Sequence, residues 1–87
     1  MITRDQVRAA RMLLDMHQPE LAILAGIGVA TLRRFESGHE IGRLHLDAIE
    51  RALTEAGVIM IAEGSRVDNR IVGAGVALKR RATSPEK

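Results

Sequence analysis

The stretch 17–38 constrains the fold most, because its helix-breaking residues leave room for only two short helices. Pro19 fits in the first turn of a helix, where its missing N–H would have no partner. Gly26 ends that helix and accepts the positive φ of a tight turn. Ala22 and Ala25 are small enough for two helices to cross steeply. The pattern therefore predicts a short helix, a glycine turn and a second short helix.

The segment before this pair predicts a first helix over about 4–15. Thr3 and Gln6 have the spacing of a capping box, in which a hydroxyl and an amide satisfy the first backbone N–H groups. Behind them, Val7, Ala10 and Leu14 recur at helical spacing, with Ala9, Leu13 and Met16 beside them. We expect this stripe to face the core, and we expect the methionines at positions 12, 16 and 60 to fill gaps in it.

Two further helices follow the glycine turn. In the helix 29–36, Leu32 and Phe35 have the spacing of inward residues, whereas Arg33 and Arg34 face outward. After a loop at about 38–44, a helix over about 45–56 carries the apolar stripe Leu46, Ile49 and Leu53 and ends before Gly57. The sequence thus predicts a mainly α fold with four helices around one small core.

After residue 57 the helical periodicity ends and the sequence has patterns typical of β-strands. The segment 58–62 is an apolar run of strand length, and 75–80 alternates as a half-buried strand does. We expect these two segments to pair antiparallel as a C-terminal β-hairpin, with extra pairing near 70–72. The predicted divisions are a helical domain at 1–57, a hairpin at 58–81 and a flexible tail at 82–87. Because the first strand is apolar on both faces, we expect the hairpin to mediate a homodimer. The alternative is that the hairpin packs only on the helices of its own chain.

Composition excludes several classes of function. The chain has 87 residues and no cysteine, so it has no disulfide and no thiol nucleophile. No apolar run approaches the roughly 20 residues of a membrane span, and no signal-peptide pattern follows Met1. We expect a cytoplasmic protein with no membrane partner. No acid, base or nucleophile pattern is present, so we predict neither enzyme activity, nor a cofactor, nor a bound metal.

Most of the basic residues are arginines, which bears on the kind of partner that the chain binds. Lys and Arg number 13 against 11 Asp and Glu, and eleven of the 13 are Arg. Arginine forms forked contacts with phosphate and guanine, although an arginine-rich composition also follows from a GC-rich genome. Phe35 is the one aromatic residue, which argues against a platform that stacks single-stranded bases.

The stretch 17–38 also resembles the phage-repressor-like helix-turn-helix transcriptional regulators, also called the xenobiotic-response-element type. Eleven residues match the pattern of that family in register: Gln18, Leu21, Ala22, Ala25, Gly26, Ile27, Thr31, Leu32, Phe35, Glu36 and Gly38. The resemblance covers about 2–57. Segments 57–61 and 75–79 are similar to the two strands that close short bacterial regulators of this type.

The resemblance implies a four-helix repressor-like domain that binds double-stranded DNA, most often as a repressor. It implies that helix 29–36 reads the major groove, with Arg34 as the main base reader and Arg33 at a phosphate or flanking base. It also implies a buried ion pair between Arg11 and Glu36. The predicted DNA-contacting residues are Gln18, Gly28, Val29, Ala30, Thr31, Arg33, Arg34 and Arg43.

Four residues depart from the family pattern and keep a second interpretation open. Val29 and Ala30 stand where polar base readers are common, and they are limited to packing on thymine methyl groups. Ile23 and Leu24 stand where the family has exposed charges. They belong either to a thicker core under the tail or loop, or to a protein interface. The alternative function is accordingly a protein-interaction module, such as an antitoxin-like partner with weakened base readout.

Overall fold

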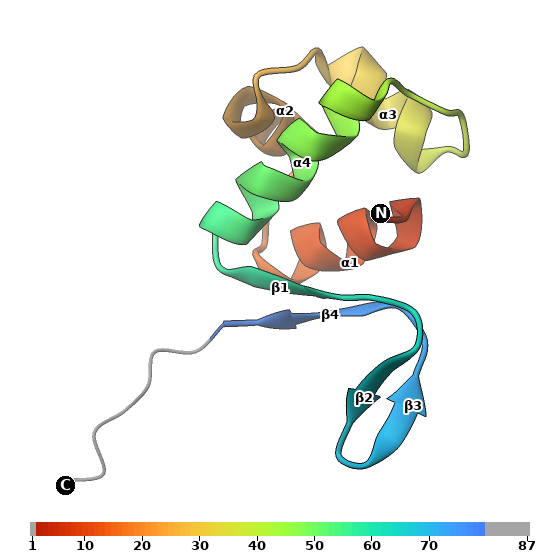
Figure 1. Cartoon of the computed structure of the whole chain (residues 1–87). Coiled ribbons are helices and arrows are strands. Elements are labelled where there is room, and N and C mark those ends of the chain that lie inside the picture. The colour runs from red at the N-terminus through yellow and green to blue at the C-terminus, as the bar shows by residue number, and fades with distance from the viewer. Residues whose placement is uncertain (1, 80–87) are drawn as a thin grey trace, which may run out of the picture.

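In the computed structural model, which describes residues 2–79, four helices are followed by four short strands (Figure 1). The helices are α1 (Arg4–Leu13), α2 (Gln18–Ala25), α3 (Val29–Glu36) and α4 (Arg43–Glu55). The strands are β1 (Val58–Ile61), β2 (Ser65–Val67), β3 (Arg70–Val72) and β4 (Gly75–Leu78). The prediction of a mainly α chain with four helices and a C-terminal hairpin is confirmed.

The first helix begins as predicted but ends earlier. The capping box is present: the Thr3 hydroxyl accepts from Gln6 N at 3.1 Å, and Gln6 Oε1 accepts from Thr3 N at 2.9 Å. The predicted end at residue 15 is wrong, because Leu14 is the C-cap and Asp15 has a φ of 52°. A right-handed helix does not continue through a residue of that conformation.

The glycine turn between α2 and α3 agrees with the sequence prediction. Gly26 is the C-cap of α2 and lies in the left-handed region at φ 70° and ψ 33°. A Cβ at this position would meet no atom within 4 Å, so the requirement for glycine comes from the backbone angle and not from crowding. Three residues later α3 begins, with the bounds that the sequence predicted.

The fourth helix begins two residues before the predicted position. Gly42 takes the extended conformation of an N-cap, with φ −62° and ψ 153°, and Arg43 is the first helical residue. The predicted loop 38–44 is correspondingly shorter. Sequence periodicity predicts the start beside Leu46, the first residue of the inward stripe, whereas Arg43 and Leu44 are both exposed and lie outside that stripe.

The core lies between the helices and the first strand. The largest side chains that are fully buried are Leu21, Leu32, Ile49, Leu53, Val7 and Val58. The predicted stripes of α2, α3 and α4 therefore face inward. Met16 and Met60 pack against this core as predicted. The prediction for Met12 is wrong, because its side chain is 81% exposed, and the expected inward position of Leu13 is also wrong, because Leu13 is 44% exposed.

The strands form two antiparallel pairs. In the first pair, β1 joins β4 with Val58 opposite Leu78 and Ile61 opposite Gly75. One face of this pair packs against α1 and α4 (Figure 1). The second pair, β2 and β3, supplies the pairing predicted near 70–72 and extends away from the helices. The predicted flexible tail at 82–87, and the end of the predicted hairpin at 80–81, lie outside the described residues.

A buried glutamine joins the hairpin to the first helix. Gln6 is 4% exposed, and its Nε2 donates to both Ile61 O and Gly75 O at 2.9 Å. These two carbonyls belong to the residue pair at which β1 ends and β4 begins. The amide that caps α1 therefore also holds the two strands where they diverge toward the second hairpin.

Candidate nucleic-acid interface

The outer face of α3 carries two arginines. Ala30, Arg33 and Arg34 are exposed, whereas Leu32 and Glu36 are buried and Phe35 is half-buried. The exposed residues are spaced three and four apart, so they share one face of the helix. Of the ion pairs within residues 2–79, none includes Arg33 or Arg34. This face therefore presents two positive charges that are not neutralised by an acidic side chain in contact with them.

A buried carboxylate fixes α3 against α1. Glu36 is 3% exposed, and its two carboxylate oxygens accept from Arg11 Nε at 2.8 Å and Arg11 Nη2 at 2.6 Å. Arg11 Nη1 donates to Met16 O at 3.2 Å, and Arg8 Nη1 donates to Glu36 O at 3.2 Å. The bidentate pair has the strong geometry of a forked guanidinium contact. The predicted ion pair is therefore present, and it connects α1, the loop before α2 and the end of α3.

The side chain of Gln18 lies between α2 and α3. Its Nε2 donates to Glu36 Oε1 at 3.1 Å, and its Oε1 accepts from Arg33 Nε at 3.3 Å. Gln18 is the first residue of α2, so the start of that helix lies beside Arg33. Pro19 follows it and carries no N–H. Glu20 Oε1 accepts from His17 N at 2.8 Å, which satisfies another backbone donor at this helix start.

The remaining predicted contact residues of α3 are at its first turn. Gly28 is the exposed N-cap, and its carbonyl accepts from Thr31 N and Leu32 N. Val29 and Thr31 are half-buried, and Val29 packs against the core. Within this turn Ala30 is the most outward of the predicted apolar readers. The first turn of α3 thus offers a small apolar surface beside the two arginines.

Arg43 lies on a different helix from the other predicted contact residues. It is the first residue of α4, its side chain is 76% exposed, and its Nε lies 3.9 Å from Asp47 Oδ1. An exposed pair of this length is weak, but the carboxylate reduces the positive charge available to a partner. Within residues 2–79, no side-chain hydrogen bond or ion pair joins Arg43 to Gln18 or to α3.

A second exposed surface is apolar. Ile23 is 78% exposed and Leu24 is 58% exposed, so the thicker core considered from the sequence is not formed by the described residues. Leu24 also borders a shallow pocket of about 180 Å³ with Ala52, Glu55 and Ala56. The exposed side chain of Leu24 therefore lies next to the last turn of α4.

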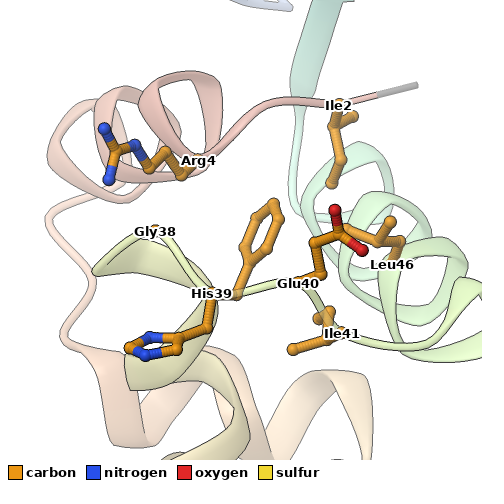
Figure 2. Close-up of a pocket in the computed structure, with 8 residues that line it drawn as sticks. Ile2, Arg4, Gly38, His39, Glu40, Ile41 and Leu46 are labelled. Carbon is orange, nitrogen blue, oxygen red and sulfur yellow. The ribbon is translucent and has the colours of Figure 1, made fainter.

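A larger hollow of about 620 Å³ lies between the end of α3 and the start of α1 (Figure 2). Its apolar lining comes from Ile2, Phe35, Ile41 and Leu46, and its charged residues are Arg4, His39 and Glu40. Gly38 has a φ of 110°, and a Cβ there would lie 2.6 Å from Arg4 Nη1. Because both signs of charge border the hollow, its chemistry does not select one class of ligand.

The part of the chain that the structure describes contains neither a metal-binding group nor a membrane-spanning helix. No group of three His, Asp or Glu residues within 2–79 is arranged to hold a metal ion. No helix among those residues is long and apolar enough to cross a membrane.

Sequence reasoning identified the residues of this surface but missed how they are connected. The Gln18–Arg33 contact depends on the crossing of α2 and α3, which residue spacing does not determine. A signal for part of this arrangement is present in the sequence, because the resemblance to repressor-like proteins predicts the Arg11–Glu36 ion pair to which Gln18 is attached. Comparison of the chain with protein-family models and with curated proteins finds no match.

Proposed function

We propose that this protein is a sequence-specific regulator that binds double-stranded DNA through a repressor-like helix-turn-helix formed by α2 and α3. The observation that carries the proposal is the exposed face of α3, where Arg33 and Arg34 lie on a helix fixed to α1 by the buried Arg11–Glu36 pair. A major groove about 12 Å wide admits a single helix, and arginine is the side chain best suited to guanine and phosphate. Such a regulator acts in the compartment that holds the DNA, which in a bacterium is the cytoplasm.

Within this proposal the residues have different roles. Arg34 lies near the centre of the exposed face and reads a base edge, because its guanidinium is engaged by no acidic side chain within residues 2–79. Ala30 and Val29 pack on thymine methyl groups at the first turn of α3. Arg33 and the backbone N–H groups at the start of α2 contact phosphates. Arg43 is a weaker phosphate contact, since Asp47 shares its charge.

We also propose that the protein acts as a homodimer through its C-terminal strands. Ile59, Ile61 and Ala77 lie on the face of the β1–β4 pair that is opposite the core, and Ile59 is 48% exposed. Neither strand carries a charged residue or a proline, which are the usual means of preventing edge pairing. A symmetric dimer with two recognition helices about 34 Å apart would select a near-palindromic site.

The exposed side chains of Ile23 and Leu24 favour a second candidate function, a protein-interaction module. In that case the partner would cover the outer face of α2 and the pocket beside α4. The two functions make opposite predictions for Ile23→Lys: a DNA-binding regulator keeps its affinity for DNA, whereas an interaction module loses its partner. Affinity for DNA and capture of a protein partner should therefore be measured on the same variant.

The proposed function is tested by a salt titration with a labelled random-sequence DNA duplex. Each phosphate that the protein neutralises should add roughly −0.9 to the slope of log K against log salt concentration. The three exposed arginines of the proposed interface, Arg33, Arg34 and Arg43, predict a clearly negative slope. Binding that is absent at low salt, or that does not change with salt, would contradict the proposal.

A further inference from the structure

We infer that Gln18 acts on DNA binding as a positioning residue, which holds Arg33 against a DNA phosphate. This inference rests on the proposed function and changes the role that the sequence resemblance implies for Gln18. The Gln18 amide makes a hydrogen bond at each of its two ends, to Glu36 and to Arg33.

The orientation of the Gln18 amide is determined by its neighbours. At one end, Glu36 Oε1 lies 3.1 Å away and is a carboxylate oxygen, so the amide nitrogen must face it. At the other end, Arg33 Nε lies 3.3 Å away and is a donor, so the amide oxygen must face it. A flipped amide would place oxygen against oxygen and donor against donor.

Glu36 is itself held in place, so the contacts run outward from a fixed, buried group to the exposed Arg33. Its carboxylate is 3% exposed and is engaged by both Nε and Nη2 of Arg11. Gln18 is therefore attached to a buried, bidentate ion pair rather than to a mobile surface group. The order of the contacts is Arg11, Glu36, Gln18 and Arg33, from the interior to the exposed face of α3.

This arrangement commits most of the Gln18 amide to the protein. Its oxygen faces Arg33, and one of the two N–H groups of its nitrogen donates to Glu36, so a single N–H of the amide is left for an acceptor such as a phosphate oxygen. Arg33 is in the opposite position, because one N–H is used by Gln18 and both terminal nitrogens stay available. A guanidinium that is oriented before binding loses less conformational freedom when it binds a phosphate.

The side of α3 on which Arg33 lies indicates its target. Arg33 is hydrogen-bonded to Gln18, at the beginning of α2, whereas Arg34 is one residue further around α3 and makes no hydrogen bond to Gln18 within residues 2–79. The start of a helix attracts phosphate through its backbone N–H groups. Arg33 is thus a phosphate contact at the edge of the reading face, and Arg34 is the base reader.

The experiment is a double-mutant cycle with Gln18→Met and Arg33→Ala, read as affinity for a labelled random-sequence duplex at several salt concentrations. Methionine keeps the length of the side chain but neither donates to Glu36 nor accepts strongly from Arg33. We expect each single variant to bind about tenfold more weakly. The double variant should be no weaker than Arg33→Ala, and each variant should lose roughly one phosphate from the salt slope.

The matched control cycle replaces Arg33→Ala with Arg34→Ala. Because no hydrogen bond among residues 2–79 joins Arg34 to Gln18, the loss caused by Gln18→Met should be the same with and without Arg34→Ala. A second variant, Arg33→Lys, keeps the charge but lacks the guanidinium Nε, so we expect it to behave like Gln18→Met. In the DNA-free protein, the NMR signal of Arg33 Nε–H should shift in Gln18→Met and stay unchanged in Arg34→Ala.

The possible outcomes distinguish failure of the proposed DNA-binding function from failure of the positioning role of Gln18. If the wild-type protein does not bind the duplex, the proposed function fails and the inference fails with it. If the wild type binds but the losses of Gln18→Met and Arg33→Ala multiply, Gln18 contacts DNA independently and only the inference is overturned. Unchanged binding by Arg33→Lys would likewise overturn it, because charge alone would then suffice.

Discussion

At the scale of single residues, Arg34 and Arg11 show how similar side chains have different roles. Arg11 is 17% exposed and is committed to Glu36, whereas Arg34 lies on the exposed face of α3. The first residue stabilises the fold and the second is free for a partner. Substitution should separate these roles, since loss of Arg34 should leave stability unchanged and loss of Arg11 should not.

Arg34→Ala should reduce discrimination between specific and random DNA by about 1–3 kcal/mol, the usual contribution of a bidentate arginine–guanine contact. Competition binding with a selected site and a random duplex measures this difference. Arg51→Ala is the matched control, because Arg51 is an exposed arginine two turns beyond the start of α4. An equal loss of specific and random binding in Arg34→Ala would show that it contacts only the phosphate backbone.

Arg11→Met should lower the free energy of unfolding by about 3 kcal/mol, because it leaves the buried Glu36 carboxylate without its cationic partner. The double variant Arg11→Met/Glu36→Leu removes the unpaired charge and should recover part of that loss. Chemical denaturation of both variants tests this expectation. If the double variant is less stable than the single one, the attraction in the ion pair outweighs its desolvation and the explanation is wrong.

At the scale of elements, the contact between α1 and the hairpin depends on Gln6. Its amide makes three hydrogen bonds, to Thr3 N and to the carbonyls of Ile61 and Gly75. Gln6→Met should therefore lower the free energy of unfolding by roughly 2 kcal/mol, since it leaves buried polar groups without a partner. Thr3→Ala removes only the cap and should cost about 1 kcal/mol. Thermal unfolding measures both.

Hydrogen exchange provides the second measurement for this prediction. In Gln6→Met the amides of β1 and β4 should exchange faster, whereas in Thr3→Ala the increase should be confined to the first turn of α1. Equal losses of stability in the two variants, with no change in the strands, would contradict the role of Gln6 as the link to the hairpin.

The elements also show which parts of the fold could be predicted from the sequence. Local signals were sufficient for the capping box and the turn at Gly26, because each depends on residues close together in the chain. The apolar and alternating patterns also predicted the pairing of β1 with β4, whereas β2 was missed because Ser65 belongs to a segment with the composition of a turn. The end of α1 was misplaced, since the left-handed Asp15 has no glycine to mark it. Met12 was assigned to the core by its apolar character, although its position on α1 faces solvent.

The candidate site was predictable to a smaller degree. The resemblance predicts Arg33 and Arg34 as contact residues and pairs Arg11 with Glu36, because each of these predictions needs only a particular residue type at a particular position of the pattern. The position of the Gln18 amide between two helices follows from their packing, which no local pattern contains. The same limit explains why the role of Gln6 at the hairpin was not anticipated.

At the scale of the whole molecule, the hairpin belongs to the same core as the helices. Val58 is 2% exposed and Met60 and Val76 pack against the helical residues, so removing the strands would damage the fold. The dimer is therefore tested with a substitution on the opposite face. Wild-type protein should scatter light as a particle of twice the 9.5 kDa chain mass, and Ile59→Lys should scatter as one chain.

Thr54→Lys is the control for that experiment, because it adds the same charge at an exposed position on α4 and leaves the outer face of the strands intact. It should keep the mass of the wild type. A wild-type monomer at micromolar concentration would contradict the dimer, and so would an Ile59→Lys variant that is folded and keeps the larger mass.

The most direct test of the central claim, that the exposed face of α3 reads double-stranded DNA, is selection of bound duplexes from a random library followed by sequencing. Wild-type protein should enrich a near-palindromic motif with half-sites about one helical turn apart, roughly 34 Å. The Arg34→Ala variant should lose the preference at one position in each half-site. Enrichment of no motif by the folded wild-type protein, or of the same motif by Arg34→Ala, would contradict the account.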